Sequence, residues 1–126
     1  MIPTTLVVPE AKLTRYLLDP DHPVGGPKAK FFNARGFSRA NATGFAQALI
    51  RHVGSADTER LITEVKADEA RLVAVGPLAC PDGSVPIVKS VWKIDVRSES
   101  ASLVTAYPAR KAAAPAQPRT IASRSA

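Results

Sequence analysis

The chain has 126 residues, 45% of them hydrophobic, and a formal net charge of +6 at pH 7. This length favours a single domain, and no segment approaches the roughly 18 consecutive apolar residues of a membrane span. Cys80 is the only cysteine, which excludes an intramolecular disulfide and a cysteine-cluster zinc site. The first residues lack the basic start and apolar stretch of a signal peptide. We therefore expect a cytoplasmic protein, unless a larger carrier delivers it elsewhere.

The positive charge is unevenly distributed along the chain. Residues 109–126 contain four basic residues and no acidic ones, among mostly small residues and proline. Such a segment buries too little apolar surface to offset the entropy of ordering, so we predict a folded domain over 1–108 and a disordered basic tail over 109–126. Within the domain, residues 1–56 have 7 basic against 3 acidic residues. The excess of positive charge in this half favours binding of a phosphate-bearing partner. A basic surface that only contacts solvent would have the same composition.

The first half of the domain is predicted to be helical after an extended start. Residues 1–9 read as extended, and Leu13, Tyr16 and Leu17 then form the apolar face of a helix over residues 10–18. A loop rich in proline and glycine follows, and Pro27 suits the first turn of a second helix over residues 27–35. A third helix is expected after Asn41, which is a favourable N-cap residue.

The second half changes to the pattern of a sheet. Strands are expected over residues 61–66, 71–78, 86–96 and 102–107, separated by short turns. No helix lies between them, so they must form an antiparallel meander. The predicted fold class is therefore α+β, with about three N-terminal helices followed by a four-stranded antiparallel meander sheet. Trp92 is expected in the core.

The loop before the second helix contains the strongest candidate site. Gly25 and Gly26 allow close approach of a ligand to the backbone, and the helix that follows directs its positive end toward the same space. Lys28 could pair with a phosphate there, with Lys30 as a further candidate cation. The spacing does not match a Walker loop, which argues against nucleotide hydrolysis. The alternative is a simple turn of the chain with both lysines in water.

Three other positions are candidates for chemistry. His22 is a candidate for acid–base catalysis, a role for which histidine is the most common side chain. The alternative is a loop histidine that caps a backbone carbonyl. Thr105 and Tyr107 are spaced by two in the last strand, so their side chains share one face and could hold a phosphate; both are also ordinary strand residues. Lys12 is a further candidate for binding the substrate. The two histidines lack the spacing of a metal site, so we expect neither a metal nor another cofactor.

Several short motifs resemble an uncharacterised bacterial domain family. They span most of the predicted domain and are the following: Lys12-Leu13, Tyr16-Leu17-Leu18, His22-Pro23, Gly26, Lys28-Ala29, Phe32, Gly36-Phe37, Gly76-Pro77-Leu78, Pro81-Asp82-Gly83, Val91-Trp92 and Leu103-Val104-Thr105-Ala106-Tyr107-Pro108. That family is in turn distantly similar to the barnase–EndoU–colicin–RelE-like ribonuclease toxins, some of which are effector ends of polymorphic toxins.

The resemblance implies a metal-independent ribonuclease-like toxin domain that cleaves RNA through its 2′-hydroxyl. His22, Lys28, Thr105 and Tyr107 would then be catalytic, and Lys12, Gly25, Gly26 and Lys30 would bind the substrate. Implied partners are RNA, with tRNA as one candidate, and a cognate immunity protein or antitoxin, but no membrane. The domain would act in the cytoplasm, including that of a target cell reached as part of a larger toxin. The alternatives are a protein-interaction or immunity-like domain without catalysis, and a sequence-tolerant nucleic-acid binder.

Overall fold

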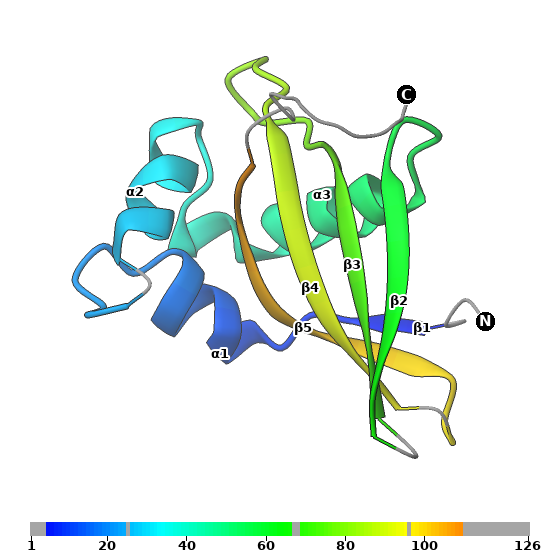
Figure 1. The fold of residues 1–126 in the computed structure, drawn as a ribbon. Helices are drawn as coiled ribbons and strands as arrows, with labels where there is room; N and C mark the ends of the chain where they lie inside the picture. Colours follow the sequence, from blue (N-terminus) through cyan, green and yellow to red (C-terminus); the bar gives the residue numbers. More distant parts are fainter. Residues whose placement is uncertain (1–4, 25, 67–68, 96, 110–126) are drawn as a thin grey trace.

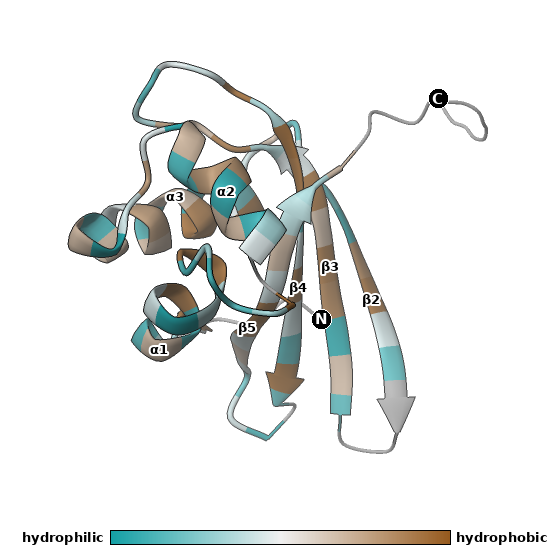
Figure 2. Cartoon of the chain, turned by 90° about the vertical axis from the view of Figure 1, so that its left-hand side faces the viewer, coloured by the Kyte–Doolittle hydropathy of each residue, from teal (hydrophilic) through white to brown (hydrophobic). Residues whose placement is uncertain are grey.

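The computed structural model describes residues 5–24, 26–66, 69–95 and 97–109, which form one sheet with helical segments on one of its sides (Figure 1). In chain order the elements are β1 (Thr5–Val7), α1 (Glu10–Lys12), the π-helical turn η1 (Leu13–Leu17), α2 (Gly26–Ala34), the 3-10 turn η2 (Arg39–Asn41), α3 (Ala42–Gly54), β2 (Glu59–Lys66), β3 (Glu69–Pro77), β4 (Ile87–Asp95) and β5 (Ser100–Pro108). In Figure 2 the helices lie together on one side of the sheet, and no helix of the described residues covers the other side. This arrangement confirms the predicted α+β class.

The sheet contains the predicted meander and one strand more than predicted. Its order is β1-β5-β4-β3-β2, and β2 to β5 are antiparallel neighbours in sequence order. The expected four-stranded sheet is wrong, because β1 adds a fifth strand that pairs in parallel with β5, with Leu6 opposite Ala101. A three-residue strand that pairs with a segment so distant in sequence leaves no local pattern by which it could be predicted. Residues 110–126 of the predicted tail lie outside the described residues.

The first predicted helix is not a regular α-helix. After α1 the backbone widens into η1, where the Leu18 N–H donates to the Leu13 carbonyl oxygen at 2.7 Å. This five-residue spacing is that of a π-helix, a rare feature that often occurs at functional sites. The third helix begins after Asn41 as predicted, but the Asn41 side chain does not make the expected capping hydrogen bond.

The core lies between the helices and the covered face of the sheet. Along β4 the side chains of Ser90, Trp92 and Ile94 are buried, which confirms the predicted core position of Trp92. Phe45, Leu49 and Val53 form the buried stripe of α3; two further aromatic rings, those of Phe32 and Phe37, pack against Phe45. Within the described residues, no helix has the length and hydrophobicity required to cross a membrane.

One histidine belongs to this core. The His52 ring is 2% exposed, with Nδ1 3.2 Å from the Pro77 carbonyl oxygen and Nε2 2.9 Å from Ser90 Oγ. The carbonyl can only accept, so Nδ1 carries the proton, and the Ser90 hydroxyl donates to Nε2. Trp92 Nε1 in turn donates to Ser90 Oγ at 2.9 Å. Burial lowers the pKa of His52 against the opposing effect of the hydrogen bond to Pro77, so the ring stays neutral and structural.

Candidate functional site

A cluster of polar side chains surrounds Tyr16, where η1 meets α2 and the end of β5. Lys28 Nζ donates a hydrogen bond to Tyr16 Oη at 2.9 Å, and Thr105 Oγ1 lies 3.1 Å from the same phenol oxygen. The phenol oxygen accepts the hydrogen bond from the Lys28 ammonium, which can only donate. The phenol O–H is then free to donate to Thr105 Oγ1. A single phenol oxygen thus joins residues that are 89 positions apart in the chain.

Two cations and an imidazole surround the Tyr16 ring. Lys12 Nζ and Lys28 Nζ lie 5.5 and 5.3 Å from the ring centroid, within the range of cation–π attraction. The His22 ring meets the Tyr16 ring edge to face, with centroids 5.1 Å apart. We call Lys12, Tyr16, His22, Lys28 and Thr105 the Tyr16 cluster.

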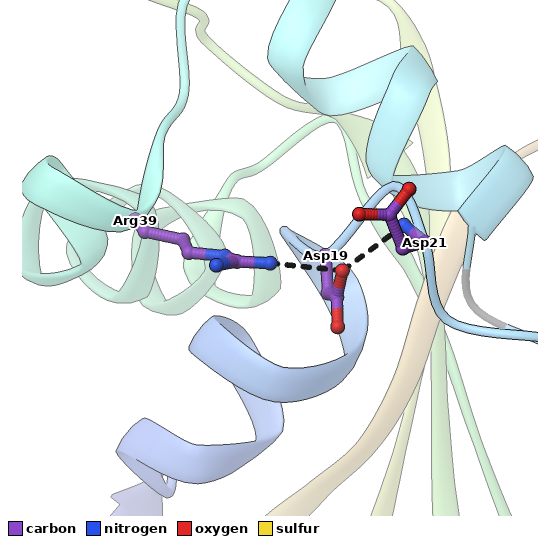
Figure 3. A network of polar contacts seen from close by, with 3 residues as sticks. All are labelled: Asp19, Asp21 and Arg39. Atoms are coloured by element: carbon purple, nitrogen blue, oxygen red, sulfur yellow. Dashed lines mark hydrogen bonds and ion pairs between the residues drawn. The ribbon is translucent and has the colours of Figure 1, made fainter.

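The loop that carries His22 is fixed at both ends. Asp19 accepts hydrogen bonds from Arg39 Nη2 at 2.8 Å and from the backbone N–H of Asp21 at 3.0 Å, which ties the loop to η2 (Figure 3). At the other end the Gly26 N–H donates to the His22 carbonyl at 2.9 Å. A Cβ at Gly26 would lie only 2.7 Å from the Pro20 carbonyl oxygen, so glycine is required there by the fold of the loop. The loop therefore holds His22 against Tyr16.

The His22 ring has a defined tautomer. Its Nδ1 accepts a hydrogen bond from the Val24 backbone N–H at 3.0 Å. An accepting Nδ1 is unprotonated, so the neutral ring carries its proton on Nε2. This hydrogen bond fixes the orientation of the ring relative to the loop backbone.

A β-bulge sets the direction of the side chains at the end of β5. Val91 pairs with Thr105 but Trp92 pairs with Leu103, so Val104 is an extra residue in β5. After the bulge Ala106 is buried, while Thr105 and Tyr107 on either side of it are partly exposed. The bulge therefore turns both hydroxyl-bearing residues away from the core, and Thr105 reaches Tyr16.

Tyr107 lies beside the Tyr16 cluster and not within it. It lines a shallow pocket of about 420 Å³ together with Pro27, Lys28 and Pro108. Its ring faces a further cation, Lys89 Nζ, at 5.9 Å from the ring centroid. Lys28 belongs to both the pocket and the cluster, so the two adjoin each other at this lysine.

The electrostatic environment lowers the pKa of Tyr16. Burial by itself raises the pKa of the phenol, but its hydrogen bonds with Lys28 and Thr105 and the charges of Lys28 and Lys12 outweigh burial and lower this pKa below 10.0. Among residues 5–24, 26–66, 69–95 and 97–109, neither Lys12 nor Lys28 forms an ion pair with a carboxylate. The positive charge around the phenol is therefore available to an anionic ligand.

The structure brings together only some of the predicted site residues. His22, Lys28, Thr105 and Lys12 meet around Tyr16, and Tyr107 lies next to them. Lys30 is exposed on α2, two residues beyond Lys28 and so directed away from it. Gly26 is required by the backbone conformation of the loop and contacts no residue of the cluster through a side chain. Gly25 lies outside the described residues. Within the described part of the chain, no three His, Cys, Asp or Glu side chains gather as metal ligands would.

The central residue, Tyr16, was not among the predicted site residues. Its place in the apolar pattern of Leu13 and Leu17 marked it as a core residue. The available signal was its spacing of four from Lys12, which places a cation over the ring on one face of a helix.

The fold and this cluster define a small α+β domain with a basic, hydroxyl-rich site where its N-terminal helical region meets its last strand. The chain belongs to the family described as Domain of unknown function (DUF6883), which matches residues 4–110. This confirms the expected membership of an uncharacterised domain family, and the relation to ribonuclease toxins stays a prediction. No curated protein and no solved structure matches the chain.

Proposed function

We propose that the Tyr16 cluster binds a phosphodiester of RNA and cleaves it without a metal ion. The observation that carries this proposal is the phenol oxygen of Tyr16, held between Lys28 Nζ at 2.9 Å and Thr105 Oγ1 at 3.1 Å, with His22 against its ring. Tyr16 and His22, which can each transfer a proton, thus lie beside the cations Lys12 and Lys28. Cleavage of a phosphodiester needs both an acid–base pair and positive charge near the phosphate.

In the proposed reaction the 2′-hydroxyl of RNA attacks the adjacent phosphorus. A bond forms between the 2′-oxygen and phosphorus, the bond from phosphorus to the 5′-oxygen breaks, and a 2′,3′-cyclic phosphate remains. His22 takes the proton of the 2′-hydroxyl as its hydrogen bond from Val24 opens. Tyr16 gives its phenolic proton to the departing 5′-oxygen, a role favoured by its lowered pKa.

The remaining residues of the site act through charge and contact. Lys28 stabilises both the negative charge that develops on the phosphate and the phenolate that Tyr16 becomes. Lys12 adds a second positive charge, and Thr105 orients the phenol. Tyr107, beside Lys28 in the shallow pocket, contacts the RNA next to the cleaved bond.

The proposal is tested by incubating the purified protein with total RNA in the presence of EDTA. We expect cleavage that leaves 2′,3′-cyclic phosphate ends. Tyr16→Phe and His22→Ala should each lower the rate by about 10²–10⁴-fold, the range of a single acid or base. Arg51→Ala removes an exposed cation from α3 and should leave the rate unchanged. Full activity in both Tyr16→Phe and His22→Ala would refute the mechanism.

The same experiment distinguishes the alternatives. Intact RNA together with affinity that falls with salt would identify a nucleic-acid binder without catalysis. Because residues 109–126 contain four basic residues, this measurement should be repeated after their removal. Intact RNA and no affinity would favour a protein-interaction domain. Under the ribonuclease proposal the partners are RNA, including tRNA, and an immunity protein or antitoxin that restrains cleavage in the producing cell.

A further inference from the structure

Strand β2 is an open edge of the sheet and displays large apolar side chains. In the sheet order β1-β5-β4-β3-β2 it is the last strand, paired on one side with β3. Leu61 is 63% exposed and Ile62 36% exposed, on its two faces. The outer side of an edge strand presents backbone N–H and C=O groups that can pair with a strand of another chain.

An apolar groove adjoins this edge. Its volume is about 600 Å³, and Leu6 of β1, Ile50 and Val53 of α3, Ile62 of β2 and Leu72 of β3 line it. Residues of both outer strands reach the same groove, so the sheet curves around the end of α3, as Figure 1 also shows. Ile50, 39% exposed, adds to the apolar surface.

Two opposite charges lie on either side of Ile62 and on its face of the strand. Arg60 and Glu64 are each two residues from Ile62, and side chains spaced by two share a face. Arg60 Nη1 donates to the carbonyl oxygens of Val53 at 2.8 Å and Ser55 at 3.0 Å, which holds its charge beside the groove. Neither Arg60 nor Glu64 forms an ion pair within the described part of the chain.

We propose that β2 pairs with β2 of a second copy of this chain, antiparallel and centred on Ile62. In this register Ile62 lies opposite Ile62, and Leu61 opposite Thr63. Arg60 of each copy then lies opposite Glu64 of the other, so a two-fold dimer contains two ion pairs. The two Ile62 side chains together cover the mouths of the grooves. The pairing of β2 with β3 is regular through Glu64, and its irregularity begins only after that residue.

This register follows from the order of charges along β2. An isologous antiparallel pair places residue i opposite residue j whenever j lies opposite i. Arg60 lies opposite Glu64 of the other copy only when the two-fold axis passes through Ile62. The same register places the exposed Leu61 and Ile62 within the interface. Opposite charges across a strand pair stabilise it, and like charges directly opposite destabilise it.

The test is the oligomeric state of the full chain by sedimentation over a wide range of concentrations. We expect a wild-type dimer, with Glu64→Lys and Arg60→Glu each monomeric because two like-charge contacts replace two ion pairs. Each variant should weaken the dimer by more than about tenfold. An equimolar mixture of the two variants should dimerise again, since both contacts are then between opposite charges.

Glu59→Lys is the matched control, because it makes the same charge change on the same strand away from the paired charges and should leave the dimer intact. Should Arg60→Glu fail to fold, Glu64→Lys and Ile62→Lys must still give monomers. A monomeric wild type at every concentration, or equal disruption by Glu59→Lys, would overturn the proposal.

Discussion

The two histidines of the chain lie in polar networks of opposite character. In the core, His52, Ser90 and Trp92 form a closed network, in which the Pro77 carbonyl, the hydroxyl and both ring nitrogens of His52 have partners. At the sheet edge, His22 and Tyr16 belong to a partly exposed cluster with Lys12 and Lys28.

The difference separates a structural polar network from the cluster that we propose to be functional. The buried network holds neutral groups, since burial disfavours the charged imidazole. The Tyr16 cluster concentrates positive charge around a phenol whose pKa is lowered. In the His52 network every ring nitrogen has a hydrogen-bond partner within the protein. In the Tyr16 cluster, by contrast, Lys12 and Lys28 form no ion pair within the described residues, so their positive charge can attract an anion.

Removing each imidazole in turn gives the largest expected contrast. His52→Ala leaves a cavity and takes the partner from the buried Ser90 hydroxyl, so we expect a loss of about 3 kcal/mol in the free energy of unfolding. His22→Ala, in a half-buried loop, should lower the free energy of unfolding by less than about 1 kcal/mol but remove the proposed cleavage of RNA. Denaturant unfolding of both variants measures the difference. Equal stability losses would contradict the division between the two sites.

The pH dependence of stability sharpens the same comparison. Because the pKa of His52 is lowered in the folded state, the unfolded chain binds its proton more readily. The contribution of His52 is therefore fully present above about pH 6.5, the ordinary pKa of histidine, and is lost as the pH falls below it. Unfolding at a series of pH values should show this slope in the wild type. His52→Gln should lack it, and an unchanged slope would refute the assignment.

Titration of Tyr16 gives the smallest expected effect. Tyr16 and Tyr107 are the only tyrosines, so Tyr107→Phe isolates the phenol of Tyr16 in an ultraviolet titration. We expect it to ionise below the ordinary pKa of about 10, and Lys28→Ala to raise its pKa by removing the hydrogen bond and the charge. A pKa unaffected by Lys28→Ala would contradict the geometry of the cluster.

Local patterns in the amino-acid sequence were sufficient for the order and type of most elements. The alternation along residues 86–96 predicted the strand with Trp92 in the core, and the turns between the strands predicted the meander. His22 and Lys28 were found as site candidates because proline and glycine mark the loop around them. These signals act over a few residues, so they can be read without knowledge of the fold.

The tertiary structure determined the features that depend on residues far apart in the chain. These are the pairing of β1 with β5, the bulge that directs Thr105 outward, and the place of Tyr16 between Lys28 and Thr105. A helical tyrosine in an apolar stripe looks the same in sequence whether its hydroxyl meets solvent or a lysine. Its partner Thr105 lies 89 residues away, and only the folding of the sheet against the helices brings the two side chains together.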